Sequence, residues 1–218
     1  MGASLAWFDH RATVPAAPVR LPPGDARLNP MTAAYAPFSA DGAEVRWRTW
    51  DGEHEETATV RWENEGWTIS GIVGRERVQY AIRTSPTWRV RQFLLFRDLE
   101  EPDLWLATDG TGRWGEMNGA HRPELDGCYD VHLECTPLTS ILPIRRLQLH
   151  EGDAAELPVV VVDTETLDVR RVVHRYARLG DRRWALVPTG APATEFEVDE
   201  HGLALDIPER FRRVPPGR

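Results

Sequence analysis

The sequence predicts an all-β fold, a curved antiparallel sheet that closes into a barrel or half-barrel. From Val45 onward, short stretches alternate between apolar and polar residues; Val78, Tyr80 and Ile82, for example, alternate with Gln79 and Arg83. This period of two is typical of strands with one buried and one exposed face. Turn residues separate the stretches at short intervals, which favours a meander. The nine Trp supply large apolar areas for a core.

Composition divides the chain into three parts. Residues 1–44 are rich in Pro and Ala, and prolines from Pro15 to Pro37 interrupt any helix or strand. We therefore expect an N-terminal arm over 1–44, a β domain over 45–213 and a short tail over 214–218. The apolar pair Trp7 and Phe8 is expected to pin the arm to its own domain, with a homodimer through the arm as the alternative.

Two segments fit more than one kind of element. Val169, Val172, Val173 and Tyr176 fit a helical stripe as well as a strand, and their β-branched content favours the strand. The stretch 136–142, which ends just before Pro143, stays ambiguous.

The charge balance excludes some partners. With 26 basic and 34 acidic residues the net charge is −8, and nucleic acids and anionic membranes are usually bound through basic patches. All the basic residues are Arg, which excludes lysine Schiff bases and the P-loop lysine. Cys128 and Cys135 lack a C-x-x-C spacing, and no signal-peptide pattern or apolar run of about 20 residues is present. We expect a cytoplasmic protein with no cofactor and no stable membrane insertion.

One short motif resembles a dinucleotide-binding fingerprint. Residues 110–115 read G-x-G-x-x-G, which binds a pyrophosphate only when it opens a helix. Gly119, Pro123 and Gly127 follow closely, so we expect a turn and a strand instead.

A second segment could carry chemistry. In a strand, Asp130, His132 and Glu134 share one face, and such a set could hold a metal or transfer protons. With no second His nearby in the sequence, we expect an ordinary solvated face and no metal ligands. The enzymatic alternative is a hydrolase acting on a glycoside or lipid ester through Asp126, Asp130 and His132.

Two adjacent arginines give the sharpest signal. If residues 143–149 form a strand, Arg145 lies on the apolar face with Leu147 and Leu149, where a charge requires a partner. That partner would be Asp126 or Asp130, a ligand anion or a sugar oxygen.

Aromatic residues fall on successive expected strands. Most should belong to the core, although a curved sheet could also present them to an acyl chain or a sugar ring. The set is Trp62, Trp67, Tyr80, Trp88, Trp105 and Trp114.

Three stretches together resemble the signature of the bacterial putative glycolipid-binding family. They are Asp126-Gly127-Cys128-Tyr129-Asp130, Thr136-Pro137-Leu138-Thr139 and Leu142-Pro143-Ile144-Arg145-Arg146-Leu147. The resemblance spans roughly residues 45–213. It implies a fold similar to the lipoprotein carriers of the bacterial envelope, with an internal apolar cavity, and a glycolipid as ligand. His132 and Ser140 depart from the pattern, which would expect Asp and Asn there.

The sequence therefore predicts non-enzymatic binding of an amphipathic ligand, a glycolipid or another lipid, with no catalytic residues. The expected polar end of the site consists of Asp126, Asp130, Arg145, Arg146, Thr136 and Thr139. Its expected aromatic walls are Tyr80, Trp88, Trp105 and Trp114. A scaffold protein without a ligand is the remaining alternative.

Overall fold

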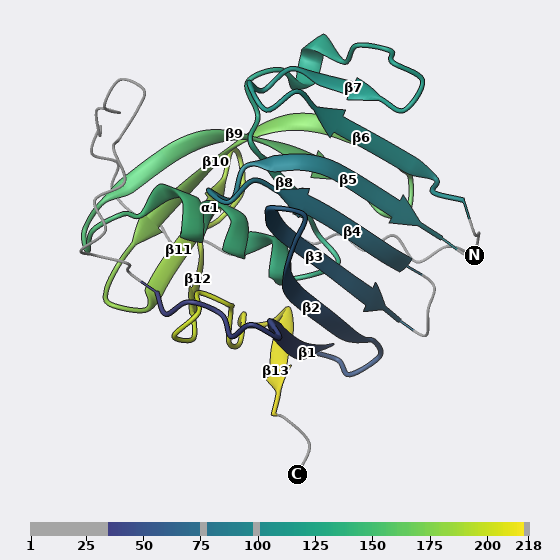
Figure 1. The fold of residues 1–218 in the computed structure, drawn as a ribbon. Helices are drawn as coiled ribbons and strands as arrows, with labels where there is room; N and C mark the ends of the chain where they lie inside the picture. Colours follow the sequence, from purple (N-terminus) through teal and green to yellow (C-terminus); the bar gives the residue numbers. More distant parts are fainter. Residues whose placement is uncertain (1–34, 75–77, 98–100, 216–218) are drawn as a thin grey trace.

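The computed structural model describes residues 35–74, 78–97 and 101–215, which form a mostly β structure (Figure 1). The strands are β1 Ala43–Thr49, β2 Glu55–Glu63, β3 Gly66–Val73, β4 Val78–Thr84, β5 Val90–Phe96, β6 Leu104–Thr108, β7 Trp114–Glu116, β8 Asp130–Leu133, β9 Ala154–Val162, β10 Val169–Arg178, β11 Arg183–Pro188, β12 Thr194–Glu197 and β13 Phe211–Val214. The helical elements are the 3-10 turns η1 Pro123–Leu125 and η2 Leu138–Ser140 and the helix α1 Ile141–Leu147.

The strands form two sheets. The larger follows the order β13-β1-β2-β3-β4-β5-β6-β7, with every neighbour antiparallel, and it curls into a half-barrel. The smaller has the order β12-β11-β10-β9-β8, with β8 parallel to β9. The expected antiparallel meander and its half-barrel curvature are confirmed.

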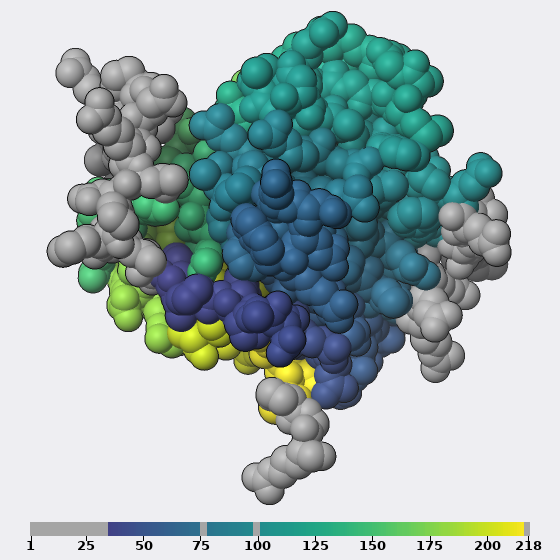
Figure 2. All heavy atoms as spheres, in the orientation of Figure 1, coloured from purple at the N-terminus to yellow at the C-terminus, as the bar shows by residue number. Residues whose placement is uncertain are grey.

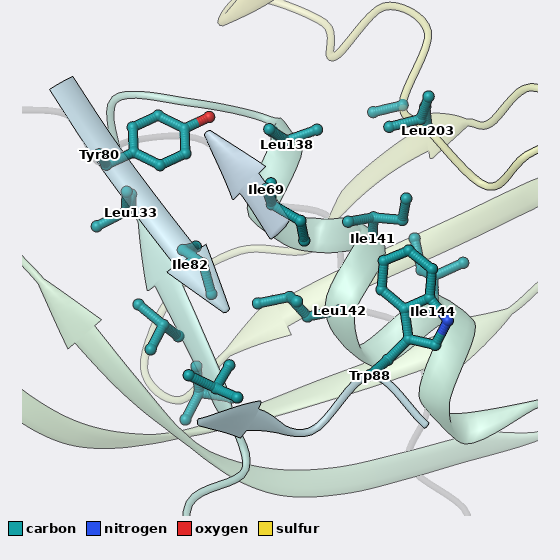
Figure 3. Close-up of a cluster of buried hydrophobic side chains, with 14 of the residues drawn as sticks. Ile69, Tyr80, Ile82, Trp88, Leu133, Leu138, Ile141, Leu142, Ile144 and Leu203 are labelled. Atoms are coloured by element: carbon teal, nitrogen blue, oxygen red, sulfur yellow. The ribbon is translucent and has the colours of Figure 1, made fainter. Parts of the chain in front are cut away.

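Alternation along each strand decides which side chains enter the core. On β2, Glu56, Ala58 and Val60 are buried, whereas Thr57 and Arg61 are exposed. The inward residues pack against the second sheet and against α1, which lies on the concave side of the half-barrel (Figure 1). Figure 3 shows Ile141, Leu142 and Ile144 of this helix among side chains of β3, β4 and β8. Buried side chains of both sheets and of α1 form one hydrophobic core in this interior; the apolar cavity that the resemblance implies stays a prediction.

The ambiguous segment 169–176 is a strand, as its β-branched content indicated, and it pairs with β9 and β11. The expectation of a strand over 143–149 is wrong, because α1 continues from η2 through Leu147. Pro143 is the third residue of α1, within the first turn, where a proline is tolerated. The G-x-G-x-x-G segment opens no helix and forms the turn between β6 and β7, with Gly110 and Gly112 at positive φ. No helix in the described ranges is long and apolar enough to cross a membrane.

Residues 35–43 lie against the domain, although the sequence placed them in the arm. Tyr35 and Phe38 are buried, and the Ala36 amide donates to the Glu200 carbonyl at 2.8 Å. Figure 2 shows this purple segment lying across the surface beside yellow residues near the C-terminus. The earlier part of the expected arm, including Trp7 and Phe8, lies outside the described residues.

Candidate functional site

Five aromatic side chains from four parts of the chain make contact at one end of the half-barrel. This aromatic cluster consists of Phe38, Trp62, Trp67, Trp88 and His201. Ring centroids of Trp62 and Trp67 lie 5.1 Å apart, and Trp67 stacks on Trp88 at 5.1 Å with an interplanar angle of 15°. Phe38 contacts Trp67 at 5.4 Å and stacks on His201 at 4.9 Å. Trp62, at the outer end, is 49% exposed, so the cluster offers an aromatic surface to solvent.

The hairpin β2–β3 and the loop between β4 and β5 bring the three indoles together. Trp62 and Trp67 are directly opposite residues of the hairpin. A Cβ on Gly66 would lie 2.0 Å from the Thr84 carbonyl oxygen, so only glycine lets the hairpin end pack this closely on the loop. Trp88 has a φ of 65°, a conformation that is strained for a bulky residue. Its stacking on Trp67 compensates this strain and fixes the indole.

Arg145 completes the cluster from α1. Its guanidinium carbon lies 5.1 Å from the Trp88 ring centroid and 5.2 Å from that of Phe38. The Nη1 group donates to the carbonyls of Ala36 and His201 at 2.9 and 3.1 Å. No carboxylate oxygen among the described residues lies within 4.0 Å of its nitrogens. Burial consequently lowers the pKa of Arg145, because its charge has lost water without gaining a counter-ion.

An open polar hollow adjoins the cluster. It has a volume of about 460 Å³ and lies between the tip of the β2–β3 hairpin and the loop that leads to Trp88. Its lining residues are Asn64, Glu65, Thr84, Ser85, Pro86 and Arg91. The hollow is open to solvent, so a ligand in it would be covered only in part. Together the cluster and the hollow combine stacking surface with hydrogen-bonding groups.

The buried ion pair expected for Arg145 is instead made by Arg146. Arg146 donates from Nη2 to Asp130 at 2.5 Å and from Nε at 3.2 Å. The expectation for Arg145 was wrong because residues 141–147 are helical, which turns neighbouring side chains by about 100° rather than to opposite faces. Asp130 is 1% exposed, so the face expected to be solvated is closed there, whereas His132 is half-buried and Glu134 is exposed. Burial raises the pKa of Asp130, against the lowering effect of Arg146.

The other expected polar residues bond within the protein. Asp126 lies near the surface, accepts from the Trp114 amide at 3.0 Å and contacts His121 at 2.9 Å. Bonding by the Trp114 amide contributes most to lowering the pKa of Asp126. Thr139 accepts from the Leu133 amide at 3.3 Å. A ligand-binding role for these residues stays a prediction.

The expected aromatic walls do not face one space. Tyr80 and Trp114 are buried in the core, and the Trp114 indole donates to the Cys128 carbonyl at 3.0 Å. Trp105 is directly opposite Leu94, on the outer face of the half-barrel, because Leu106 occupies the inward position next to it. Trp88 alone of the four belongs to the aromatic cluster.

A buried carboxyl group escaped the sequence reasoning. Glu56 is 3% exposed; Tyr80 donates to its Oε1 at 2.5 Å and Thr136 to its Oε2 at 2.6 Å. Burial raises the pKa of Glu56 to about 7. A hollow of about 10 Å³ beside it, which also borders Cys135, has the size of one water molecule. The signal was available, since Glu56 is in phase with Ala58 and Val60.

His132 has a second imidazole nearby, contrary to the reasoning from sequence. The rings of His132 and His174 lie 5.0 Å apart, edge to face. Burial lowers the pKa of both, to about 4 for His174. Within the described ranges, no three His, Cys, Asp or Glu side chains gather closely enough to hold a metal ion.

Comparison with protein-family models matches residues 44–213 to the family described as "Putative glycolipid-binding". The chain belongs to this family. A crystal structure of a DUF1089 family protein from Pseudomonas aeruginosa has the same fold, with a TM-score of 0.61 and 24% sequence identity over 83% of this chain and 97% of that one. Comparison with curated proteins gives no match.

Residues 126–147, on which the resemblance to this family depended, join the half-barrel to the second sheet. Arg146 on α1 holds Asp130 on β8, and Thr136 before η2 holds Glu56 on β2. These contacts fix the path of residues 130–147, and with it the position of Arg145 in the aromatic cluster.

Proposed function

We propose that this protein binds an amphipathic ligand that carries a sugar, at the aromatic cluster and the adjoining hollow. The observation that carries the proposal is the continuous aromatic contact from the half-exposed Trp62, through Trp67 and Trp88, to the guanidinium of Arg145. The family's description as glycolipid-binding supports a ligand of this class.

The aromatic cluster and the hollow each suit one part of a glycoside. An indole face is apolar and polarisable, so it packs on the face of a sugar ring that presents C–H groups. Asn64 lines the hollow, and its side-chain amide can both donate to and accept from a sugar hydroxyl. Thr84 and Ser85 also line it, although their hydroxyls already bond within the protein, to the Ser85 carbonyl and to Thr87. The tip of the β2–β3 hairpin and the loop between β4 and β5 therefore supply both a stacking surface and a hydrogen-bonding group.

The apolar part of the ligand would lie on the protein surface. Side chains such as Ile69, Phe93 and Leu106 are fully buried and pack together in the interior, so we place the acyl chain outside this core. We therefore expect affinity to rise with chain length by clearly less than the ~0.8 kcal/mol per methylene of full burial.

Calorimetric titration with octyl and decyl β-glucoside, below their micelle concentrations, tests the proposal. We expect Trp62→Ala to weaken binding about tenfold or more, the usual effect of removing a central aromatic contact. Trp50→Ala is the matched control: Trp50 is 39% exposed but follows β1 at the other end of the hairpin, next to Arg212. Equal affinity of the two variants would contradict the proposed site. Absence of binding to the wild-type protein would contradict the function.

A further inference from the structure

Arg145 differs in its surroundings from three other partly buried arginines. Arg146, Arg178 and Arg213 each have a carboxylate oxygen within 3.4 Å. Arg145 has none among the residues that the structure describes, although three aromatic rings cover it. A guanidinium in such surroundings lacks both full hydration and a counter-ion.

The free edge of this guanidinium is the one suited to an anion. Only Nη1 makes hydrogen bonds within the described structure, to the carbonyls of Ala36 and His201. The Nε and Nη2 groups form the planar fork that pairs with two oxygens of a carboxylate or phosphate. The rings of Phe38 and Trp88 hold this fork in place, so little conformational entropy remains to be lost on binding.

The nearby charges are consistent with an anion. Asp199 is the carboxylate whose charge acts on Arg145, after the Tyr35 phenol, and it already pairs with Arg213 at 3.4 Å. Arg91 lines the hollow and donates only to the Asp109 carbonyl, at 3.4 Å, within the described structure. Glu65 is the acidic residue of that lining. The hollow is therefore lined by one guanidinium and one carboxylate, and the guanidinium of Arg145 has no carboxylate partner among the described residues.

We propose that the ligand's polar end is acidic, and that a carboxylate, phosphate or sulfate on it binds the Nε–Nη2 edge of Arg145. This inference rests on the proposed function and narrows its ligand class from glycosides in general to acidic ones.

The test compares octyl β-glucuronide with octyl β-glucoside, which differ in one carboxylate, by calorimetric titration. We expect the wild-type protein to bind the glucuronide about tenfold or more tightly, as is usual for a hydrogen-bonded ion pair that is partly buried. Arg145→Gln should remove the preference for the glucuronide over the glucoside. Arg212→Gln is the matched control, because it removes another guanidinium that lies over an indole; this variant should retain the preference for the glucuronide. In the wild-type protein the preference should decrease as salt is added, a measurement that requires no variant.

Equal affinities for the two glycosides would overturn the acidic-ligand inference and leave the proposed function intact. A preference that persists in Arg145→Gln would also overturn it. Absence of binding to either glycoside would refute both proposals. Glucuronate without an alkyl chain should bind more weakly than octyl glucuronide. Equal affinity would indicate that the acidic ligand is a free sugar acid rather than the headgroup of a lipid.

Discussion

Glu56 makes the stability of the protein depend on pH. Its carboxyl group is buried between two hydroxyl donors, Tyr80 and Thr136, and no cation contributes to its pKa. When the group is protonated, the proton can be donated to the Tyr80 oxygen. Tyr80 can then donate to Thr136, at 3.4 Å, and Thr136 to the other carboxyl oxygen. The network therefore satisfies the neutral acid without the cost of a buried charge.

The magnitude follows from the pKa. In the folded protein it is about 7, against 4.5 for an ordinary glutamate. Between these values the unfolded chain has lost the proton and the folded protein has kept it. The contribution of Glu56 to stability therefore decreases as pH rises from 4.5 to about 7 and is constant above that range. At about 1.4 kcal/mol for each tenfold change in the ionisation equilibrium, the loss is about 3 kcal/mol.

Urea unfolding of the wild-type protein and of Glu56→Gln, from pH 4.5 to about 8, measures this effect. The amide is neutral at every pH, so the difference between the two free energies of unfolding should change by about 3 kcal/mol in favour of the variant. Glu55→Gln is the control, because Glu55 is exposed and pairs with Arg48; its curve should parallel that of the wild type. If the Glu56→Gln and wild-type curves run parallel instead, the buried acid does not titrate as argued.

Three further outcomes are expected. Arg146→Met should lower the free energy of unfolding by about 3–5 kcal/mol because it leaves Asp130 buried without its partner, whereas Asp126→Asn near the surface should lower it much less; urea midpoints in the reverse order would contradict the assignment of the pair. The purified protein should contain no stoichiometric transition metal, and zinc by elemental analysis that disappears in His132→Ala and His174→Ala would refute this. Limited proteolysis should cut the proline-rich residues before Tyr35 and spare 35–43, which pack on the domain; early cleavage within 35–43 would contradict that packing.

The sequence predicted the sheet more reliably than the site. Period-two alternation identifies strands such as β4 and β10 because one face of each is buried, and the turn at Asn64-Glu65-Gly66 marks the hairpin that carries Trp62 and Trp67. The same reasoning wrongly predicted a strand around Arg145, which lies in α1. A short helix of apolar and β-branched residues does not differ from a strand in local composition.

The remaining site residues had weak local signals. Tyr35 and Phe38 follow a proline-rich stretch, and only their contacts with distant residues, such as the Tyr35 hydroxyl with the Trp184 indole, place them in the domain. Trp88 lay in an expected strand, yet stacking on Trp67 holds it at a positive φ. Tertiary packing decides both cases, and a single sequence does not encode it in a readable pattern.

The most direct test of the proposed site is the set of tryptophan indole N–H resonances during titration with octyl β-glucoside and octyl β-glucuronide. The site predicts that the indoles of Trp62, Trp67 and Trp88 shift progressively and saturate. Those of Trp50, at the other end of the hairpin, and of Trp114, bonded to the Cys128 carbonyl, should stay in place. Saturating shifts at Trp50 or Trp114, with the cluster unchanged, would show that the ligand binds elsewhere.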